Sequence, residues 1–308
     1  TRSPTVTGVQ TCALPIYTLD MHTLLKGAPV RDAIDRDIIS RVDSLKKSGN
    51  VPKIATFRIG EDDGEKYYEG AIIKRAAKYG IECESVVLEE EVAQEAAEKE
   101  LARLNGDDAT CGIIMLMPFP KTIDSERMRS LLSPAKDIDA ITDASYAKLF
   151  ANDPDAFYAC TAESCMEILK FYGVELKGKQ VTIIGRSMRV GKPLMLMMMN
   201  ANATVTVCHT RTTDENLKEA CERADVVVLA TGQIESYSPE LFHDNQVIID
   251  VGTGTGKDGK LAGDFDSGAL DKPGMPSSLN YSPVPGGVGT VTTALLLRNI
   301  VKAAELGK

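Results

Sequence analysis

Residues 180–199 read Gln-Val-Thr-Ile-Ile-Gly-Arg-Ser-Met-Arg-Val-Gly-Lys-Pro-Leu-Met-Leu-Met-Met-Met. The run from Gln180 to Ile184 is rich in β-branched residues, the run from Leu194 to Met199 is apolar and helical, and a glycine turn joins them. A strand, a glycine turn and a helix in this order direct free backbone N–H groups and the positive end of a helix dipole at a phosphate. Because its two glycines lie six positions apart, the turn is not G-x-G-x-x-G. It predicts a nucleotide site only together with its surroundings.

Strands and helices alternate on both sides of this stretch. After it we expect strands at Ala203–Cys208, Asp225–Ala230 and Gln246–Val251 and a helix at Asp214–Cys221. Before it we expect a helix over Val30 to Leu45, a strand at Lys53–Ile59 and a helix at Lys66–Tyr79, with Glu82–Leu88, Val92–Leu104 and Cys111–Met117 continuing the alternation. This order predicts two α/β domains, the C-terminal one a Rossmann-type, doubly wound parallel sheet.

A second glycine loop lies near the C-terminus, where Ser282 to Thr290 reads Ser-Pro-Val-Pro-Gly-Gly-Val-Gly-Thr before an apolar helix. Two prolines stiffen the approach, and three glycines in four positions allow positive φ angles and a close approach of the backbone. An ordinary surface turn needs only one Gly or Pro. We therefore expect a loop that contacts a ligand.

Composition limits the class of protein. A chain of 308 residues with 43% hydrophobic content can bury a large core, and its length suggests two domains. A formal net charge of −9 disfavours nucleic acid and anionic membrane surfaces as partners. No apolar stretch reaches the length of a membrane span, and the methionine-rich Pro193–Asn200 is expected to be a packed core helix.

Cysteine and histidine usage bears on metals and compartment. The seven cysteines show no C-x-x-C spacing, which is typical of reduced thiols in a cytoplasm and favours neither a zinc site nor a disulfide framework. With three histidines and no H-E-x-x-H, we expect no metal and no His-based triad.

The first residues are treated separately. Val6 to Ile16 reads as the translation of a sequencing-library adapter, so residues 1–16 are expected to be an artefactual or disordered leader and are excluded from fold prediction. Met21 is the expected natural start, and the apolar run is too short and broken for a signal peptide.

Four motifs occur in an order that resembles the methylenetetrahydrofolate dehydrogenase/cyclohydrolase family. They are Gly185-Arg-Ser-x-x-Val-Gly-x-Pro193, Ala203-Thr-Val-Thr-Val-Cys-His-x-Arg-Thr212, Val247-Ile-Ile-Asp-Val-Gly252 and Pro283-Val-Pro-Gly-Gly-Val-Gly289. The resemblance implies a folate-binding domain formed by residues 21–157 and 286–308, the latter a helix that crosses back, and an NAD(P)-binding domain formed by residues 158–285. It also implies an active site in the interdomain cleft and a homodimer.

The resemblance implies a tyrosine that stacks on the aminobenzoyl ring of the folate and, four residues later, a lysine that serves the cyclohydrolase step. Aligned without gaps, the tyrosine is Tyr68 and the lysine position is Ile72. Lys74 lies about 240° beyond Tyr68 around a helix, so we expect it to be solvated or salt-bridged. Leu116 stands where the family has an assisting glutamine. The two replacements together predict a weak or absent cyclohydrolase.

The other contacts that the resemblance implies have candidate residues in this sequence. Pro134-Ala-Lys-Asp-Ile-Asp139 is similar to a family motif whose second aspartate binds the pterin, although Ala140 replaces a glycine, so Asp139 is the expected pterin ligand and Asp137 a capping or turn residue. Further substrate contacts are expected at Pro285, Gly286 and Gly287. Cofactor contacts are expected at Gly185, Arg186, Ser187, Gly191, His209, Arg211, Thr231, Gly232 and Gly252.

The expected cofactor is NADP, with NAD as the alternative. No acidic residue follows the strand ending at Cys208 to hold a ribose 2′-hydroxyl, and Arg211 is placed to pair with a 2′-phosphate. Arg211 as a plain surface residue, and Arg186 as a competing phosphate ligand, are the alternatives.

The sequence thus predicts a cytoplasmic enzyme that oxidises methylenetetrahydrofolate to methenyltetrahydrofolate. A bifunctional dehydrogenase/cyclohydrolase is the first alternative. A two-domain dehydrogenase resembling shikimate dehydrogenase and a non-catalytic folate or nucleotide sensor are the others.

Overall fold

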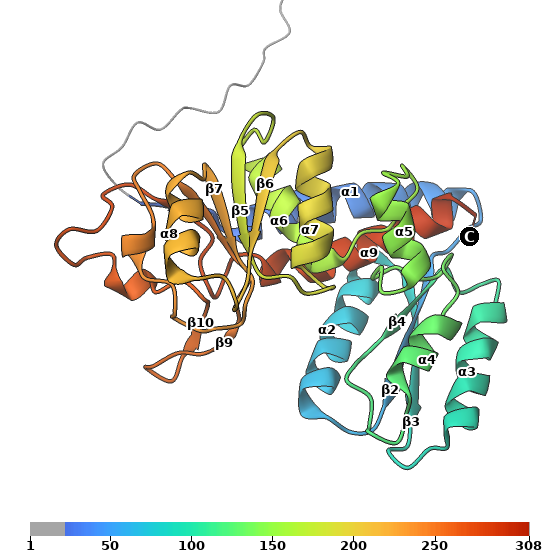
Figure 1. Ribbon diagram of the computed structural model, residues 1–308. Helices are drawn as coiled ribbons and strands as arrows, with labels where there is room; N and C mark the ends of the chain where they lie inside the picture. Colours follow the sequence, from blue (N-terminus) through green and yellow to red (C-terminus); the bar gives the residue numbers. More distant parts are fainter. Residues whose placement is uncertain (1–21, 308) are drawn as a thin grey trace, which may run out of the picture.

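The computed structural model describes residues 22–307 and shows two α/β lobes bridged by long helices (Figure 1). The predictions for residues 1–16 and for Met21 lie outside the described residues. No helix between residues 22 and 307 combines the length and the apolar character needed to cross a membrane.

The larger lobe is built on a six-stranded sheet. Its strands are β1 (Thr23–Leu24), β11 (Asn280–Tyr281), β8 (Val247–Asp250), β7 (Val226–Leu229), β5 (Gln180–Ile184) and β6 (Thr204–Cys208), in that spatial order. All five neighbouring pairs are parallel. The predicted Rossmann-type sheet is therefore present.

Residues of strand β7 show why this sheet is covered on both faces. Val226 and Val228 belong to the hydrophobic cluster that includes α6 (Cys160–Phe171) and α7 (Gly191–Asn200). Val227 and Leu229 belong to another cluster, which includes residues of α8 (Asp214–Glu222). Because successive side chains of a strand point to opposite faces, a continuous run of apolar residues requires helices on both sides.

The smaller lobe holds a three-stranded parallel sheet in the order β3 (Glu82–Leu88), β2 (Lys53–Ile59), β4 (Gly112–Met115). Its helices are α2 (Asp63–Tyr79), α3 (Gln94–Gly106) and α4 (Ser125–Leu131). Helix α2 begins where the Asp62 carboxylate accepts the N–H of Glu65, and it ends at Gly80 with a left-handed φ of 71°. These two caps fix where α2 begins and ends.

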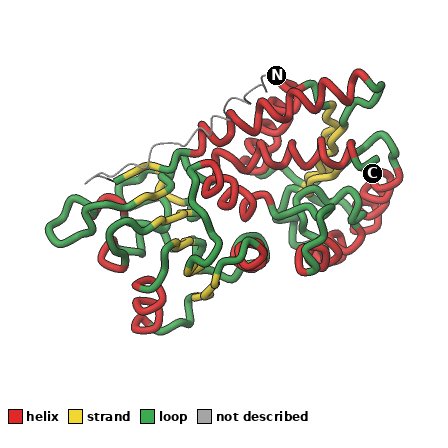
Figure 2. Tube along the Cα trace, turned by 90° about the horizontal axis from the view of Figure 1, so that it is seen from above, coloured by secondary structure: helices red, strands yellow, loops and turns green. Residues whose placement is uncertain are grey.

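Two long helices connect the lobes. Helices α1 (Gly27–Lys47) and α9 (Gly289–Glu305) lie side by side across the molecule (Figures 1 and 2). Arg41 of α1 pairs with Glu305 of α9 at 2.7 Å, and Arg298 of α9 pairs with Glu163 of α6 at 2.7 Å. The last helix thus packs against the first one, and its assignment to the folate-binding domain stays a prediction.

The other elements are short. They are α5 (Asp143–Phe150), the antiparallel pair β9 (Gly254–Thr255) and β10 (Leu261–Ala262), and 3-10 turns at Pro239–Leu241 and Ser267–Ala269. The structure differs from the expected domain limits at one point, because β1 pairs with β11 in the larger sheet although residues 21–157 were assigned to the other domain.

Candidate active site

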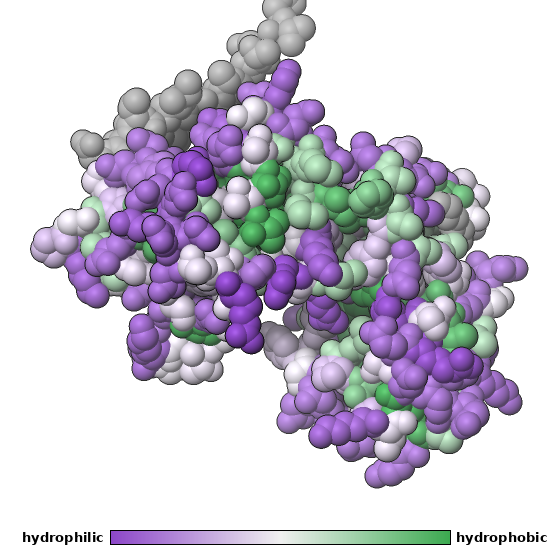
Figure 3. All heavy atoms as spheres, viewed as in Figure 1, coloured by the Kyte–Doolittle hydropathy of each residue, from purple (hydrophilic) through white to green (hydrophobic). Residues whose placement is uncertain are grey.

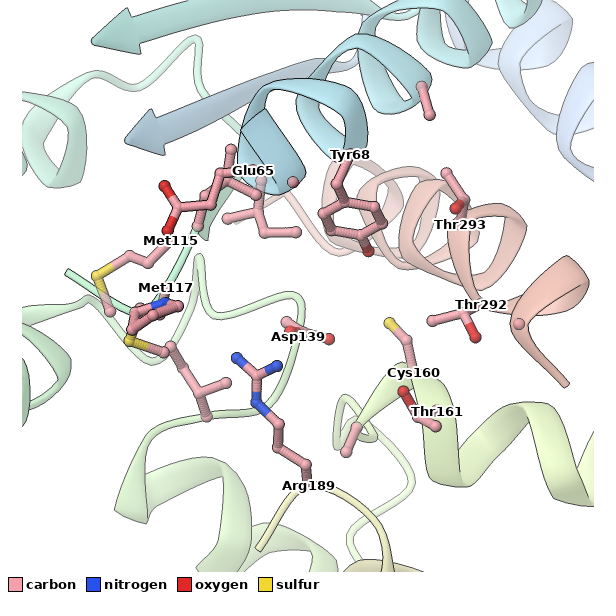
Figure 4. A pocket seen from close by; sticks show the side chains of 18 of the residues that line it. Glu65, Tyr68, Met115, Met117, Asp139, Cys160, Thr161, Arg189, Thr292 and Thr293 are labelled. Carbon is pink, nitrogen blue, oxygen red and sulfur yellow. The ribbon is translucent and has the colours of Figure 1, made fainter. Parts of the chain in front are cut away.

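A cavity of about 820 Å³ lies between the lobes. Figure 3 shows the surface notched at this place, and Figure 4 shows the side chains that line the cavity. The smaller lobe contributes the first turns of α2, the end of β4 and the loop before α5, whereas the larger lobe contributes Arg189 and Thr253. The starts of α6 and α9 complete the wall, with Cys160, Thr161, Thr292 and Thr293. The cavity is an interdomain cleft.

Tyr68 projects from α2 into this cavity (Figure 4). The ring is half-buried and packs against the large hydrophobic cluster, so it presents a fixed aromatic surface to the cavity. Burial raises the pKa of the Tyr68 hydroxyl, and the nearby Asp139 carboxylate raises it further. Tyr68 therefore stays neutral and serves as a stacking surface with a polar edge.

The two aspartates of the Asp137-x-Asp139 motif differ in their surroundings. Asp137 is fully buried, and its carboxylate accepts hydrogen bonds from the N–H groups of Ile141 at 3.0 Å and Thr142 at 2.7 Å and from the Ser145 hydroxyl at 2.6 Å. It therefore holds the start of α5, the capping or turn role predicted for it.

Asp139 lines the cavity between Tyr68 and Arg189 (Figure 4). Burial raises the pKa of its carboxyl group, and the positive charge of Arg189 opposes this rise. A carboxylate held in this way can accept paired hydrogen bonds from adjacent N–H groups of a ligand. The structure brings the two predicted folate residues, Tyr68 and Asp139, into one cavity.

Three charged residues of the cavity were not predicted: Asp62, which caps α2, Glu65 and Arg189. Arg189 belongs to the loop before α7 and directs its guanidinium toward Asp139 (Figure 4). Its place in the predicted phosphate loop was the only available indication. Glu65 lies on α2 three residues before Tyr68, so the two side chains share one face of the helix. This i, i+3 spacing was the signal in the sequence that could have indicated Glu65.

The positions expected for a cyclohydrolase are both apolar in this fold. Ile72 is completely buried (0% exposed) in the hydrophobic core and is not among the residues that line the cavity. Leu116 lines the cavity at the end of β4. Lys74 lies outside the cavity, in a separate exposed groove with Lys66, Arg75 and Lys78. Lys74 thus does not face Tyr68, in agreement with the helical spacing.

The glycine turn after β5 is folded tightly onto itself. Gly185 has a φ of 141°, and a Cβ atom on it would collide with the carbonyl group of Ala230. A Cβ atom on Gly191 would collide with the carbonyl oxygen of Gly185. Arg186 and Ser187 are exposed between the two glycines, and the Ser187 hydroxyl accepts the N–H of Val190 at 3.2 Å. The turn leads directly into the N-terminus of α7, an arrangement suited to a phosphate.

Other expected cofactor residues lie at the ends of neighbouring strands. His209 follows β6, and its Nδ1 atom accepts the backbone N–H of Arg211 at 3.1 Å. The side chain of Arg211 is exposed. The N–H groups of Thr231 and Gly232 donate to the Asp264 carboxylate at 2.8 and 3.0 Å. These two N–H groups are therefore used within the protein.

Gly252 and the second glycine loop also contact the protein's own chain. A Cβ atom on Gly252 would collide with Asp264. Gly286 has a φ of 107° and its carbonyl accepts the N–H of Gly27 at 2.8 Å, while Gly287 packs against Pro283. Of residues 282–290 only Gly289 lines the cavity. Ligand contacts of Pro285, Gly286 and Gly287 stay a prediction.

Within residues 22–307, no cluster of three or more His, Cys, Asp or Glu side chains is arranged to hold a metal ion.

A Rossmann-type lobe, a second α/β lobe and a cavity between them define a two-domain oxidoreductase of the α/β class. Residues 25–139 match the family model described as tetrahydrofolate dehydrogenase/cyclohydrolase, catalytic domain, and residues 159–308 match that family's NAD(P)-binding domain. The chain belongs to the tetrahydrofolate dehydrogenase/cyclohydrolase family. The family and the fold class predicted from the sequence are thereby confirmed.

Individual relatives agree with this assignment. The chain is 40% identical over 286 residues to the "Bifunctional protein FolD" of Alkaliphilus metalliredigens, covering 92% of this chain and 98% of that protein. It is similar in structure to the bifunctional FolD enzyme of Campylobacter jejuni, with a TM-score of 0.87, 31% identity and coverage of 92% and 99%. The FolD structure of Trypanosoma brucei, complexed with NADP and an inhibitor, matches with a TM-score of 0.83, 31% identity and coverage of 92% and 98%.

Proposed function

We propose that this protein is a methylenetetrahydrofolate dehydrogenase with little or no methenyltetrahydrofolate cyclohydrolase activity. The proposal rests on a contrast, within the smaller lobe, between the predicted folate-binding positions and the positions associated with the cyclohydrolase. Tyr68 and Asp139 enter the same cavity, whereas the two positions associated with the cyclohydrolase hold Ile72 and Leu116. The residues for binding a folate are present, and those for moving protons at these positions are absent.

Each residue of the proposed site has a physical task. The Asp139 carboxylate accepts hydrogen bonds from the amino and ring N–H groups of the pterin, and the Tyr68 ring stacks on the aminobenzoyl group. The turn from Gly185 to Gly191 and the start of α7 hold the cofactor phosphates. The nicotinamide supplies the hydride chemistry, so the protein contributes alignment and electrostatics. Hydride transfer needs no protein base.

Hydrolysis of the methenyl bridge makes a different demand. Water must be activated and protons moved as the ring opens, and positioned acid–base groups typically accelerate such steps about 10²–10⁴-fold. Neither Ile72 nor Leu116 can donate or accept a proton. Both side chains also exclude water from their part of the lobe, since they are 0% and 4% exposed.

A bifunctional dehydrogenase/cyclohydrolase is the second candidate. The names of the relatives favour it, because the proteins of Alkaliphilus metalliredigens and Campylobacter jejuni are both called bifunctional. Under this alternative another group of the cavity takes over the acid–base work. A non-catalytic folate or nucleotide sensor is the third candidate, and it predicts binding without turnover.

For the cofactor we propose NADP, with NAD as the alternative. The exposed Arg211 side chain follows β6 at the place where the second ribose is bound in Rossmann folds, and no carboxylate stands beside it in the sequence Cys208 to Thr213. The NADP complex of the Trypanosoma brucei relative supports this choice.

We also propose a cytoplasmic homodimer. The cytoplasmic location rests on six free cysteines within the described residues, the pattern of a reducing compartment. The homodimer rests on the family resemblance alone, and sedimentation of the purified protein tests it.

One assay separates the candidates. Purified protein is mixed with methylenetetrahydrofolate and NADP or NAD, and formation of methenyltetrahydrofolate is followed. In parallel, decay of methenyltetrahydrofolate is measured above its spontaneous rate in a buffer of low background catalysis. Turnover in the first assay with no acceleration in the second supports the proposal. Comparable rates in both establish the bifunctional enzyme, and binding without any turnover establishes the sensor.

A further inference from the structure

Glu65 is a buried carboxylate in the wall of the cavity. It lies on the first turn of α2, three residues before Tyr68 on the same face, and it is only 8% exposed. Its side chain extends toward the end of β4, where Met115 and Met117 lie (Figure 4). Tyr68, one turn further along the same face of α2, is proposed to stack on the aminobenzoyl ring and Asp139 to bind the pterin, so the one-carbon bridge that joins these two parts of the folate lies in the same cavity as the Glu65 carboxylate.

The Glu65 carboxylate has no partner in the part of the chain that the structure describes. Its Oε2 atom is enclosed and accepts no hydrogen bond. In a capping box the side chain would accept the N–H of Asp62, but only the reverse bond is formed, from the Glu65 N–H to the Asp62 carboxylate at 3.0 Å. Arg58, the cation whose charge acts on Glu65, is engaged by Glu69 at 2.9 Å.

This arrangement is unfavourable for the fold. Burial raises the pKa of Glu65, the negative charge of Asp62 raises it further, and Arg58 opposes the rise. A buried carboxylate without donors costs free energy, so a purely structural role does not explain Glu65. Unpartnered buried groups in a cavity wall are characteristic of functional sites.

The reaction supplies a suitable partner. The methylene carbon gives up a hydrogen with its electron pair to the nicotinamide ring, and the carbon is left with one positive charge shared between the two folate nitrogens. No proton moves in this step. A fixed carboxylate in a cavity walled by Met115, Leu116 and Met117 is much less screened than in water. It therefore stabilises the charge that develops in the transition state.

We propose that Glu65 is a catalytic residue whose ionised carboxylate contacts the one-carbon bridge of the folate and stabilises the methenyl cation during hydride transfer. This inference rests on the proposed dehydrogenase function. Glu65 stays ionised throughout and forms no covalent bond. The same interaction favours binding of cationic methenyltetrahydrofolate over tetrahydrofolate, which has neither the one-carbon bridge nor its positive charge.

The test is Glu65→Gln, which keeps the shape and removes the charge. The dehydrogenase kcat should fall on the order of 10- to 100-fold, the scale of one charge-assisted interaction. The affinity ratio of methenyltetrahydrofolate to tetrahydrofolate, measured by calorimetry without cofactor, should fall by a similar factor. The melting temperature should stay equal or rise, because an unpartnered buried charge is removed. Glu65→Asp, which keeps the charge, should retain more activity than Glu65→Gln.

Glu69→Gln is the matched control. Glu69 is a buried carboxylate of the same helix, bonded to Thr56 at 2.6 Å, Ser85 at 2.7 Å and Arg58 at 2.9 Å, and it does not line the cavity. This variant should lose melting temperature while the folded fraction keeps its kcat and its affinity ratio. The two variants should therefore change stability and activity in opposite ways.

The outcomes separate a failure of the proposed function from a failure of the role of Glu65. If the unmodified protein shows no dehydrogenase turnover, the proposed function fails and the inference fails with it. If the unmodified protein is active and Glu65→Gln keeps both its kcat and its affinity ratio, only the role of Glu65 is overturned. If Glu65→Gln leaves hydride transfer intact and slows enzymatic decay of methenyltetrahydrofolate, the carboxylate activates water instead, and the bifunctional alternative replaces the proposal.

Discussion

The carbonyl oxygen of Gly185 occupies the space where a side chain on Gly191 would begin. The two glycines close the turn between β5 and α7, and neither tolerates a Cβ atom without movement of backbone. The turn can therefore keep its shape only with glycine at both positions, which makes its geometry directly testable.

Gly191→Ala should weaken cofactor binding by at least about tenfold, since the added methyl group displaces the turn that leads into the helix N-terminus. Folate binding should change little. Fluorescence titration with the reduced cofactor and calorimetry with folate measure the two effects. Equal loss of both affinities would show a general folding defect, and unchanged cofactor affinity would contradict the assigned site.

Asp139→Ala should depress dehydrogenase turnover strongly, because the pterin loses its paired acceptor. Asp137→Ala provides a contrast, since it removes three internal hydrogen bonds, each worth about 0.5–1.5 kcal/mol. We expect Asp137→Ala to lower the free energy of unfolding in urea, whereas Asp139→Ala should not. Unchanged turnover in Asp139→Ala would contradict the assignment of Asp139 as the pterin ligand.

Tyr68→Ala should weaken folate binding by about 0.5–1.5 kcal/mol beyond the loss of buried area, because a stacking surface is removed. Tyr68→Phe keeps the ring and should bind almost as well as the unmodified protein. Equilibrium titration with folate measures both. If Tyr68→Phe weakened folate binding by more than this range, the hydroxyl and not the ring would be the main contact.

Arg211→Ala should reduce the preference for NADP over NAD by roughly ten- to hundredfold, the equivalent of about 1.5–3 kcal/mol for a charge-assisted contact. The ratio of kcat/KM for the two cofactors is the quantity to compare. Arg186→Ala is the companion variant, since Arg186 is exposed in the glycine turn. A preference that moves only with Arg186 would transfer the role to that residue.

Ile72→Lys alone should not create a cyclohydrolase. Ile72 is 0% exposed in the hydrophobic core, so an ammonium group there is buried without a partner. We expect a lower melting temperature and no accelerated decay of methenyltetrahydrofolate. Ile72→Lys combined with Leu116→Gln is the better rescue, because the amide supplies a partner in the cavity wall. Substantial cyclohydrolase activity in the unmodified protein would contradict the ungapped alignment that identified these positions.

Asp250 gives a prediction for pH dependence. Burial raises its pKa to about 6, although the N–H groups of Phe265 and Asp264 donate to it and oppose the rise. Because the native state binds this proton more tightly than the unfolded chain, the stability contribution of Asp250 is complete below about pH 4 and falls as the pH rises to about 6. Asp250→Ala should thus lower the free energy of unfolding, measured by urea titration, more at pH 4.5 than at pH 7.5. An equal or reversed difference would contradict the raised pKa.

Local patterns were sufficient for the regular parts of the fold. The expected strands at Lys53–Ile59, Glu82–Leu88 and Gln180–Ile184 coincide with β2, β3 and β5. Strands β2 and β5 are largely buried and carry β-branched residues, which favour the extended conformation. Helix α6 was missed. Its buried face includes Cys160, Ser164 and Cys165, small or polar residues that give no strong apolar periodicity.

Long-range features could not be predicted from such patterns. Strand β1 has two residues, and Thr23 pairs with Asn280 across most of the chain. The carbonyl of Gly286, a residue for which a ligand contact stays a prediction, accepts the N–H of Gly27 in the structure, an internal contact that the sequence did not indicate. A sequence shows that backbone must approach closely at such a position, and it does not show whether the approaching group is a ligand or the protein itself.

The return of α9 to α1 has a consequence for biosynthesis. The buried face of α1, with Val30, Ile34, Ile38 and Val42, packs in a hydrophobic cluster with α9, which is translated more than 240 residues later. While the ribosome is still reading the larger lobe, this face lacks its contact with α9 and has only earlier elements such as α2 and α6 as neighbours. The nascent chain therefore exposes part of an amphipathic helix until α9 has been synthesised, and apolar surface exposed in this way is prone to aggregation during folding.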